Sequence, residues 1–162
     1  MLLLEHRGKF VDTKKLSLDK LVLERFVEEG IKSENTDLAR ASSRAKKILS
    51  RMEQVFENRD QLLTSQGLIR LYYWMVRTMG GKKELRDFLL AFERERKHNR
   101  RIAKESPDHA DQQLLSFDIL NRSPDDQASY VKRFEILGAR YAEFVGARSG
   151  TSPKSEPQTT RA

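Results

Sequence analysis

The segment from Leu68 to Val76 constrains the fold most strongly, because Arg70 is its only charged residue. Its aromatic and β-branched residues would suit a buried strand as well as a buried helix, and periodicity does not separate the two. Length does, since about 14 residues lie between a helix cap at Thr64 or Ser65 and a stop at Gly80-Gly81, whereas strands usually have about 4–8 residues. A helix that is apolar nearly all round needs neighbours on every side. We therefore predict a central helix between this cap and these glycines.

Helical spacing of apolar residues predicts five further helices around it. The clearest covers 36–58, where the apolar residues form one stripe and Lys, Arg and Glu fill the other face. The last starts at a variant of the capping box, with Ser123 as the N-cap, Pro124 at the first helical position and Asp126 at the third. The five cover about 17–30, 36–58, 82–104, 114–120 and 123–146.

These elements predict an all-α protein with a single helical domain of about six helices. The domain covers 17–146, and the helices at 36–58, 82–104 and 123–146 pack on the central one. An irregular N-terminal segment, 1–16, precedes it. Residues 147–162 are rich in Ser, Thr and Pro and have nothing to bury, which predicts a disordered tail.

Cysteine content and hydropathy exclude several classes of protein. The 162 residues include no cysteine, so the chain has no disulfide framework, thiolate nucleophile or cysteine-based zinc site. Its apolar start, Met1–Leu4, is shorter than the roughly 7–15 residues of a signal-peptide core. No stretch approaches the roughly 18 apolar residues of a membrane span. We expect a soluble cytoplasmic protein that makes no membrane contact.

Most of the net charge of +7 lies in residues 82–104, which hold nine Lys and Arg against four Asp and Glu. At helical spacing four basic residues share one face and a fifth lies beside it. A stripe of this kind can follow a phosphate backbone by releasing counterions. The alternative is an ordinary solvated face, with Glu93 and Lys97 as an i, i+4 pair. The candidate nucleic-acid-binding residues are Arg94, Lys97, Arg100, Arg101 and Lys104.

The sequence contains no recognisable catalytic or metal-binding motif. His6, His98 and His109 lack the spacing of a metal site, and Gly80-Gly81-Lys82-Lys83 lacks the first glycine and the hydroxyl of a phosphate-binding loop. Tyr72-Tyr73-Trp74 could stack on bases, but so apolar a segment favours core positions with internal hydrogen bonds. We predict no cofactor and no metal, and we assign no catalytic residue; whether the chain is an enzyme stays open.

Three segments together resemble a known family. They are Gln66–Arg77, then Leu85–Leu89 with Phe92, Glu93 and Arg96, and then Asn121–Ser129 with Arg133, Ile136 and Leu137. In order and spacing they are similar to the helical C-terminal part of ParB-like proteins related to the N-terminal half of GmrSD-type restriction endonucleases. The resemblance covers about residues 18–145. Its most specific part is the loop Asn121-Arg122-Ser123 with the following Asp126-Gln127. The role of Asn121, Arg122, Ser123, Asp126 and Arg133 is open.

The family also has an N-terminal region that this chain lacks. That region carries an Asp-Gly-Gln-Gln-Arg-type motif tied to nucleotide binding and nuclease activity, whereas this chain has no Asp-Gly dipeptide. Where the family reads Ser-Thr-Asn-Asp, this chain reads Ser123-Pro124-Asp125-Asp126, which puts polar contacts of the replaced residues in doubt. The resemblance thus carries over no catalytic residue. It implies either the C-terminal fragment of a longer gene or a stand-alone helical module.

Two functions follow as expectations. In the first, the chain is the non-catalytic helical part of a ParB-like, restriction/defence-type protein that acts on DNA. It would support a nuclease/NTPase domain or contact DNA through the basic helix at 82–104. In the second, it is a helical protein–protein interaction module without a nucleic-acid role. Neither reading specifies the DNA target or the oligomeric state.

Overall fold

A computed structural model of the chain describes residues 1–12, 36–80 and 83–149. The regular elements in these ranges are six α-helices and two short 3-10 helices, and none of the described residues is in a strand. The all-α prediction is confirmed. The α-helices are α1 (Leu2–Arg7), α3 (Thr36–Val55), α4 (Gln66–Met79), α5 (Lys83–Glu105), α6 (Gln112–Leu120) and α7 (Gln127–Ser149), and the 3-10 helices are η1 (Gln61–Leu63) and η2 (Pro107–His109).

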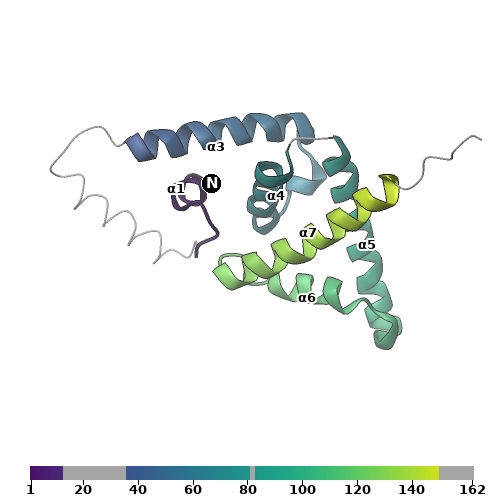
Figure 1. Cartoon of the computed structure of the whole chain (residues 1–162). Coiled ribbons are helices and arrows are strands. Elements are labelled where there is room, and N and C mark those ends of the chain that lie inside the picture. Colours follow the sequence, from purple (N-terminus) through teal and green to yellow (C-terminus); the bar gives the residue numbers. More distant parts are fainter. Residues whose placement is uncertain (13–35, 81–82, 150–162) are drawn as a thin grey trace, which may run out of the picture.

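Helix α4 lies at the centre, as its composition predicts. Figure 1 shows α3 along one side of it and α6 and α7 along the other, and α4 contacts both α3 and α7. The run from Leu71 to Val76 is fully or almost fully buried. The helix ends at Gly80, whose φ of 82° disfavours other residues. The segment is thus a buried helix of 14 residues, as its length predicts, and not the strand that the same residues would allow.

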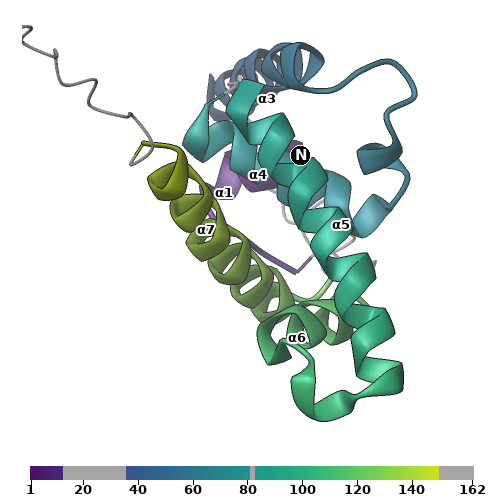
Figure 2. The same cartoon turned by 90° about the vertical axis from the view of Figure 1, so that its right-hand side faces the viewer.

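Helix α5 connects the two sides of the molecule. Figure 2 shows it running from α3 toward α6, and it contacts both of them and α7. Its first half packs on the core through Leu85, Phe88, Leu89 and Phe92, all buried. The Phe88 ring meets Tyr141 and Phe144 of α7 at centroid distances of 5.2 and 5.6 Å. The second half of α5 extends beyond this core toward α6, which leaves much of its surface in solvent.

The N-terminal segment is not irregular throughout, because Leu2–Arg7 forms α1 against α3. Leu4 is buried, and the Glu5 side chain is only 1% exposed. Glu5 accepts hydrogen bonds from Tyr73 Oη at 3.0 Å and Arg77 Nε at 2.8 Å, both on α4. Six residues are too few to show a helical period in sequence, and docking on α3 and α4 stabilises this turn instead.

Several predicted boundaries differ from the structure or fall outside its described residues. Helix α7 continues to Ser149, so residues 147–149 are helical and do not belong to a disordered tail. Helix α3 ends at Val55, three residues before the predicted end. The predicted helix at 17–30 and the tail from residue 150 onward lie outside the described residues. Within the described ranges, no helix combines the length and apolar character needed to cross a bilayer.

Candidate functional site

The second half of α5 carries the predicted basic residues on its surface. Helix α5 continues without interruption through this region to Glu105, so the residues keep their helical spacing. Every member of the predicted set is exposed: Arg94, Lys97, Arg100, Arg101 and Lys104. Arg96, from the same charged run, is different because its side chain is only 3% exposed. The structure therefore separates one structural arginine from five surface cations.

Most of these surface cations are unpaired within the described part of the chain. No described residue forms a hydrogen bond or an ion pair with the side chain of Arg94, Lys97, Arg101 or Lys104. Arg100 Nη1 lies 3.6 Å from Asp118 Oδ2, and its side chain is 47% exposed. The alternative Glu93–Lys97 pair is not formed, since Glu93 contacts Tyr72 and Arg96 instead.

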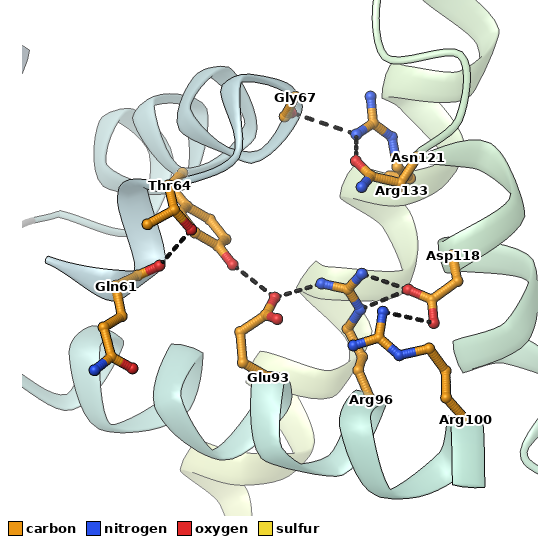
Figure 3. Close-up of polar contacts among 10 residues, drawn as sticks. Gln61, Thr64, Gly67, Glu93, Arg96, Arg100, Asp118, Asn121 and Arg133 are labelled. Carbon is orange, nitrogen blue, oxygen red and sulfur yellow. Dashed lines mark hydrogen bonds and ion pairs between the residues drawn. The ribbon is translucent and has the colours of Figure 1, made fainter.

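A buried polar network lies beneath this surface (Figure 3). Arg96 pairs with Glu93 of its own helix and with Asp118 of α6, where its Nε donates to Asp118 Oδ1 at 3.0 Å. Tyr72 of α4 donates to Glu93 Oε1 at 2.9 Å. The Arg96 guanidinium also lies 4.6 Å from the centroid of Phe117. The network joins α4, α5 and α6 and holds both carboxylates in place.

The pKa shifts in this network keep Arg96 positively charged and the Tyr72 phenol neutral. Burial alone lowers the pKa of Arg96, but the charges of Glu93 and Asp118 raise it above its ordinary value. Burial, followed by the neighbouring charge of Glu93, raises the pKa of Tyr72 well above its ordinary value. Tyr72 therefore keeps its proton and donates a hydrogen bond to Glu93, in agreement with the prediction of core aromatics with internal hydrogen bonds. Tyr73 likewise donates to Glu5.

A pocket opens between the basic part of α5 and the start of α4. Its volume is about 470 Å³. Arg94, Arg96, Lys97 and Arg100 line it from α5, and Asn121 lines it from the loop after α6. Thr64 and Ser65, which precede α4, also line it. Three of the five predicted surface cations thus border a concave site rather than only a convex helix face.

The loop singled out by the family resemblance has a structural role through Arg133. This side chain has 0% exposure and lies on α7. Its Nη1 donates to Asn121 Oδ1 at 2.8 Å and to the Gly67 carbonyl at 3.3 Å. Its Nη2 and Nε donate to the carbonyls of Pro124 and Ser129 at 3.3 and 3.2 Å. All four acceptors are uncharged oxygens, and burial accordingly lowers the pKa of Arg133.

Close packing at Gly67 explains the glycine near the start of α4. A Cβ built at this position would lie 2.7 Å from Pro124 Cβ and 3.1 Å from Asn121 Oδ1. Arg70, one turn later, forms an ion pair with Asp125. The first and third segments of the resemblance therefore meet in space, and Asn121 joins their contact to the wall of the pocket.

The start of α7 corrects the predicted capping box. The helix begins at Gln127, so Ser123 and Pro124 lie in the preceding turn. Asp126 is the N-cap, and its Oδ2 accepts from the Ser129 amide at 3.0 Å. The Pro124 carbonyl is turned toward Arg133 and Arg70, which holds the turn outside the helix. Arg122 and Ser123 are exposed.

Sequence reasoning missed two residues that support the site, Arg96 and Asp118. The buried positions of α5 continue past Phe92 to Arg96 and Asn99 at steps of four and three. The helical period itself therefore places Arg96 on the buried face, a signal that its charge conceals. Asp118 carried no such signal, because only the packing of α6 on α5 brings it to Arg96.

Comparisons with family models, curated proteins and solved structures found no match to the chain. In the described ranges, no three His, Cys, Asp or Glu side chains lie close enough together to hold a metal ion.

Proposed function

We propose that this protein binds the phosphate backbone of nucleic acid through the exposed face of the second half of α5. The observation that carries the proposal is the set of unpaired cations on this face, Arg94, Lys97, Arg101 and Lys104. Arginines that serve the fold, such as Arg86 and Arg140, are paired with carboxylates. Those on this face have no such partner among the described residues and remain available to an external anion.

The arrangement favours phosphate contacts over base contacts. A regular helix presents its cations at fixed spacing to a polyanion, and each phosphate neutralised releases counterions. The aromatic side chains that could stack on bases, Tyr72 and Tyr73, are buried in the core, and so is Trp74. Phosphate contacts fix position and carry no sequence information directly. Binding on this face is therefore independent of sequence.

We also propose that the chain is the helical part of a ParB-like, restriction/defence-type protein that works beside a nuclease/NTPase domain. Support comes from the three segments of the resemblance. The first and third contact each other through Gly67 and Arg133, and Arg96 of the second is buried. Genomic sequence tests this proposal: an adjoining reading frame that encodes an Asp-Gly-Gln-Gln-Arg-type motif supports it. A family comparison that places the chain elsewhere overturns it.

Charge reversal on α5 tests the nucleic-acid proposal. We expect the triple variant Arg94→Glu, Lys97→Glu, Arg101→Glu to bind duplex DNA much more weakly. The slope of log affinity against log salt should fall by about 2–3, because each phosphate contact contributes roughly 0.9. Fluorescence anisotropy with a labelled duplex at several salt concentrations measures both quantities.

The matched control reverses three charges on another helix. Lys46→Glu, Lys47→Glu and Arg51→Glu change the net charge equally on α3, where Lys46 and Lys47 are exposed and Arg51 is half-buried. If both triple variants bind equally, long-range charge alone explains binding and α5 is not the interface. Absence of DNA binding by the unchanged protein would instead favour the protein–protein interaction module.

A further inference from the structure

The pocket beside α5 has a net positive charge that its own network does not cancel. Arg94, Arg96, Lys97 and Arg100 line it, while Glu93 in its wall and Asp118 behind it are the carboxylates bonded to these arginines. Four cations against two carboxylates leave a surplus of two positive charges. A dianionic group would neutralise this surplus.

Asp118 contacts two of the four cations in the pocket, whereas no described residue pairs with Arg94 or Lys97. Asp118 accepts from Arg96 and lies 3.6 Å from Arg100, so it orients both guanidinium groups (Figure 3). Asp118 Oδ2 is buried and has no hydrogen-bond partner in the structure. Glu93 is already occupied by Tyr72 and Arg96. An incoming anion therefore meets Arg100, which lies beside Asp118, together with the unpaired cations Arg94 and Lys97.

The remaining walls suit an organic group attached to that anion. Leu62, Leu68 and Leu90 line the pocket, and Leu90 is 37% exposed. Thr64, Ser65 and Asn121 add uncharged polar groups. The start of α4 borders the same space, and the Ser65 side chain caps none of its amides, so the positive end of the helix dipole adds to the field. The volume of about 470 Å³ falls in the range of small-molecule sites.

We infer that this pocket binds a phosphate monoester, with the phosphate on Lys97, Arg100 and Arg94 and the organic group against Leu62, Leu68 and Leu90. The phosphate can belong to a free mononucleotide or to the 5′ end of a nucleic acid strand. This site shares Arg94 and Lys97 with the proposed backbone-binding face, but it also includes Arg100 and excludes Arg101 and Lys104.

Calorimetric titration of the full chain tests the inference with adenosine monophosphate, inorganic phosphate and adenosine, at constant ionic strength set with chloride. We expect adenosine monophosphate to bind more tightly than phosphate and adenosine to show no binding. Lys97→Ala and Arg100→Ala should each weaken adenosine monophosphate binding about tenfold or more, the usual effect of losing a charge-assisted hydrogen bond. Thermal melts followed by circular dichroism verify that each variant is folded.

The matched control is Arg101→Ala with Lys104→Ala, on the same helix but outside the pocket. This variant should keep its affinity for adenosine monophosphate within about twofold while losing affinity for duplex DNA. Equal affinity in all variants, or no binding of adenosine monophosphate by the unchanged protein, overturns the inference. Failure of the backbone proposal gives a different result. The unchanged protein would then not bind duplex DNA, or its duplex affinity would not respond to charge reversal on α5, while adenosine monophosphate would still bind.

Oligonucleotides distinguish the two sources of the phosphate. A short single strand with a 5′ phosphate should compete with adenosine monophosphate better than the same strand with a 5′ hydroxyl if strand ends are bound. No competition by either strand assigns the site to free mononucleotides. Both results support a monoester site, whereas equal competition by the two strands contradicts it, because phosphodiesters would then bind as well as the monoester.

Discussion

At the scale of single residues, arginine has two distinct roles in this protein. Arg96 and Arg133 are buried and bind oxygens from several elements, whereas Arg94 and Arg101 extend into solvent. The planar guanidinium suits the buried role, because it directs several donors to different acceptors at once. Arg133 uses it to hold Gly67, Asn121 and Pro124 together. We therefore expect Arg133 to contribute to the stability of the fold.

Replacing Arg133 with Met tests this structural role. The change fills similar space but leaves buried carbonyls and the Asn121 amide oxygen without a donor, which should destabilise the fold by about 2–4 kcal/mol. Urea unfolding at pH 7 measures the loss. Arg122→Met, on an exposed side chain of the same loop, should stay within about 0.5 kcal/mol of the unchanged protein. Similar unfolding midpoints for both variants would show that Arg133 does not hold the loop.

At the scale of secondary-structure elements, an aspartate caps the start of both α6 and α7. Asp111 caps α6 by accepting from the amides of Gln113 and Leu114 at 2.8 and 3.1 Å, and it pairs with Arg140 of α7. Asn99 near the end of α5 exchanges two hydrogen bonds with the Asp111 backbone. Asp111 thus caps α6 and joins it to α5 and α7.

The pH dependence of stability should reveal this cap. Burial alone raises the pKa of Asp111, but the Leu114 amide, Arg140 and the Gln113 amide lower it below its ordinary value. Because the folded pKa is below the unfolded one, the stabilisation is present above about pH 4 and is lost as pH falls through the folded pKa. Asp111→Asn keeps a capping oxygen but removes the charge.

We expect Asp111→Asn to cost roughly 0.5–1 kcal/mol at pH 7, since its pairing with Arg140 is partly exposed. The difference from the unchanged protein should shrink toward pH 3. Urea unfolding at several pH values measures it. Asp108→Asn changes an exposed carboxylate nearby and should show no such trend. A cost that stays constant from pH 7 to pH 3 would mean that the Asp111 charge does not contribute.

At the scale of the whole molecule, the N-terminal segment is part of the fold. Glu5 of α1 joins α3 through Arg44 and α4 through Tyr73 and Arg77. Asp12, later in the same segment, accepts from the Gln127 amide at the start of α7 at 2.7 Å. Twelve described residues therefore contact three of the longer helices. Their contribution to stability should exceed what so short a helix could supply alone.

Glu5→Ala tests this contribution. The change leaves the Tyr73 hydroxyl and the Arg77 Nε without their buried acceptor, which should cost about 1–3 kcal/mol. Thermal and urea unfolding monitored by circular dichroism measure the loss. Glu53→Ala removes an exposed carboxylate from α3 and should change stability by less than about 0.5 kcal/mol. Equal stability of the two variants would show that α1 is not required.

Much of the fold was predictable because its signals are local. The periodic apolar stripes placed α3, α4, α5 and α7 within a few residues of their observed ends, and glycine marked the end of α4. Helix α1 was not predicted because its six residues show no helical period. Asp126, and not Ser123, is the N-cap of α7, because the Pro124 carbonyl bonds to Arg133 outside the helix. Of the candidate site, the exposed cations were predicted and the pocket was not.

The sequence by itself determined the helical class, the central position of α4 and the concentration of positive charge on α5, because each depends on residues close together in the chain. Tertiary structure alone decided which charges are available. Arg96 and Arg100 are four residues apart, yet packing of α6 buries one against Asp118 and leaves the other about half exposed at a pocket. The partners of a charged side chain come from distant segments, so its role depends on the packing of the helices rather than on its own position in the sequence.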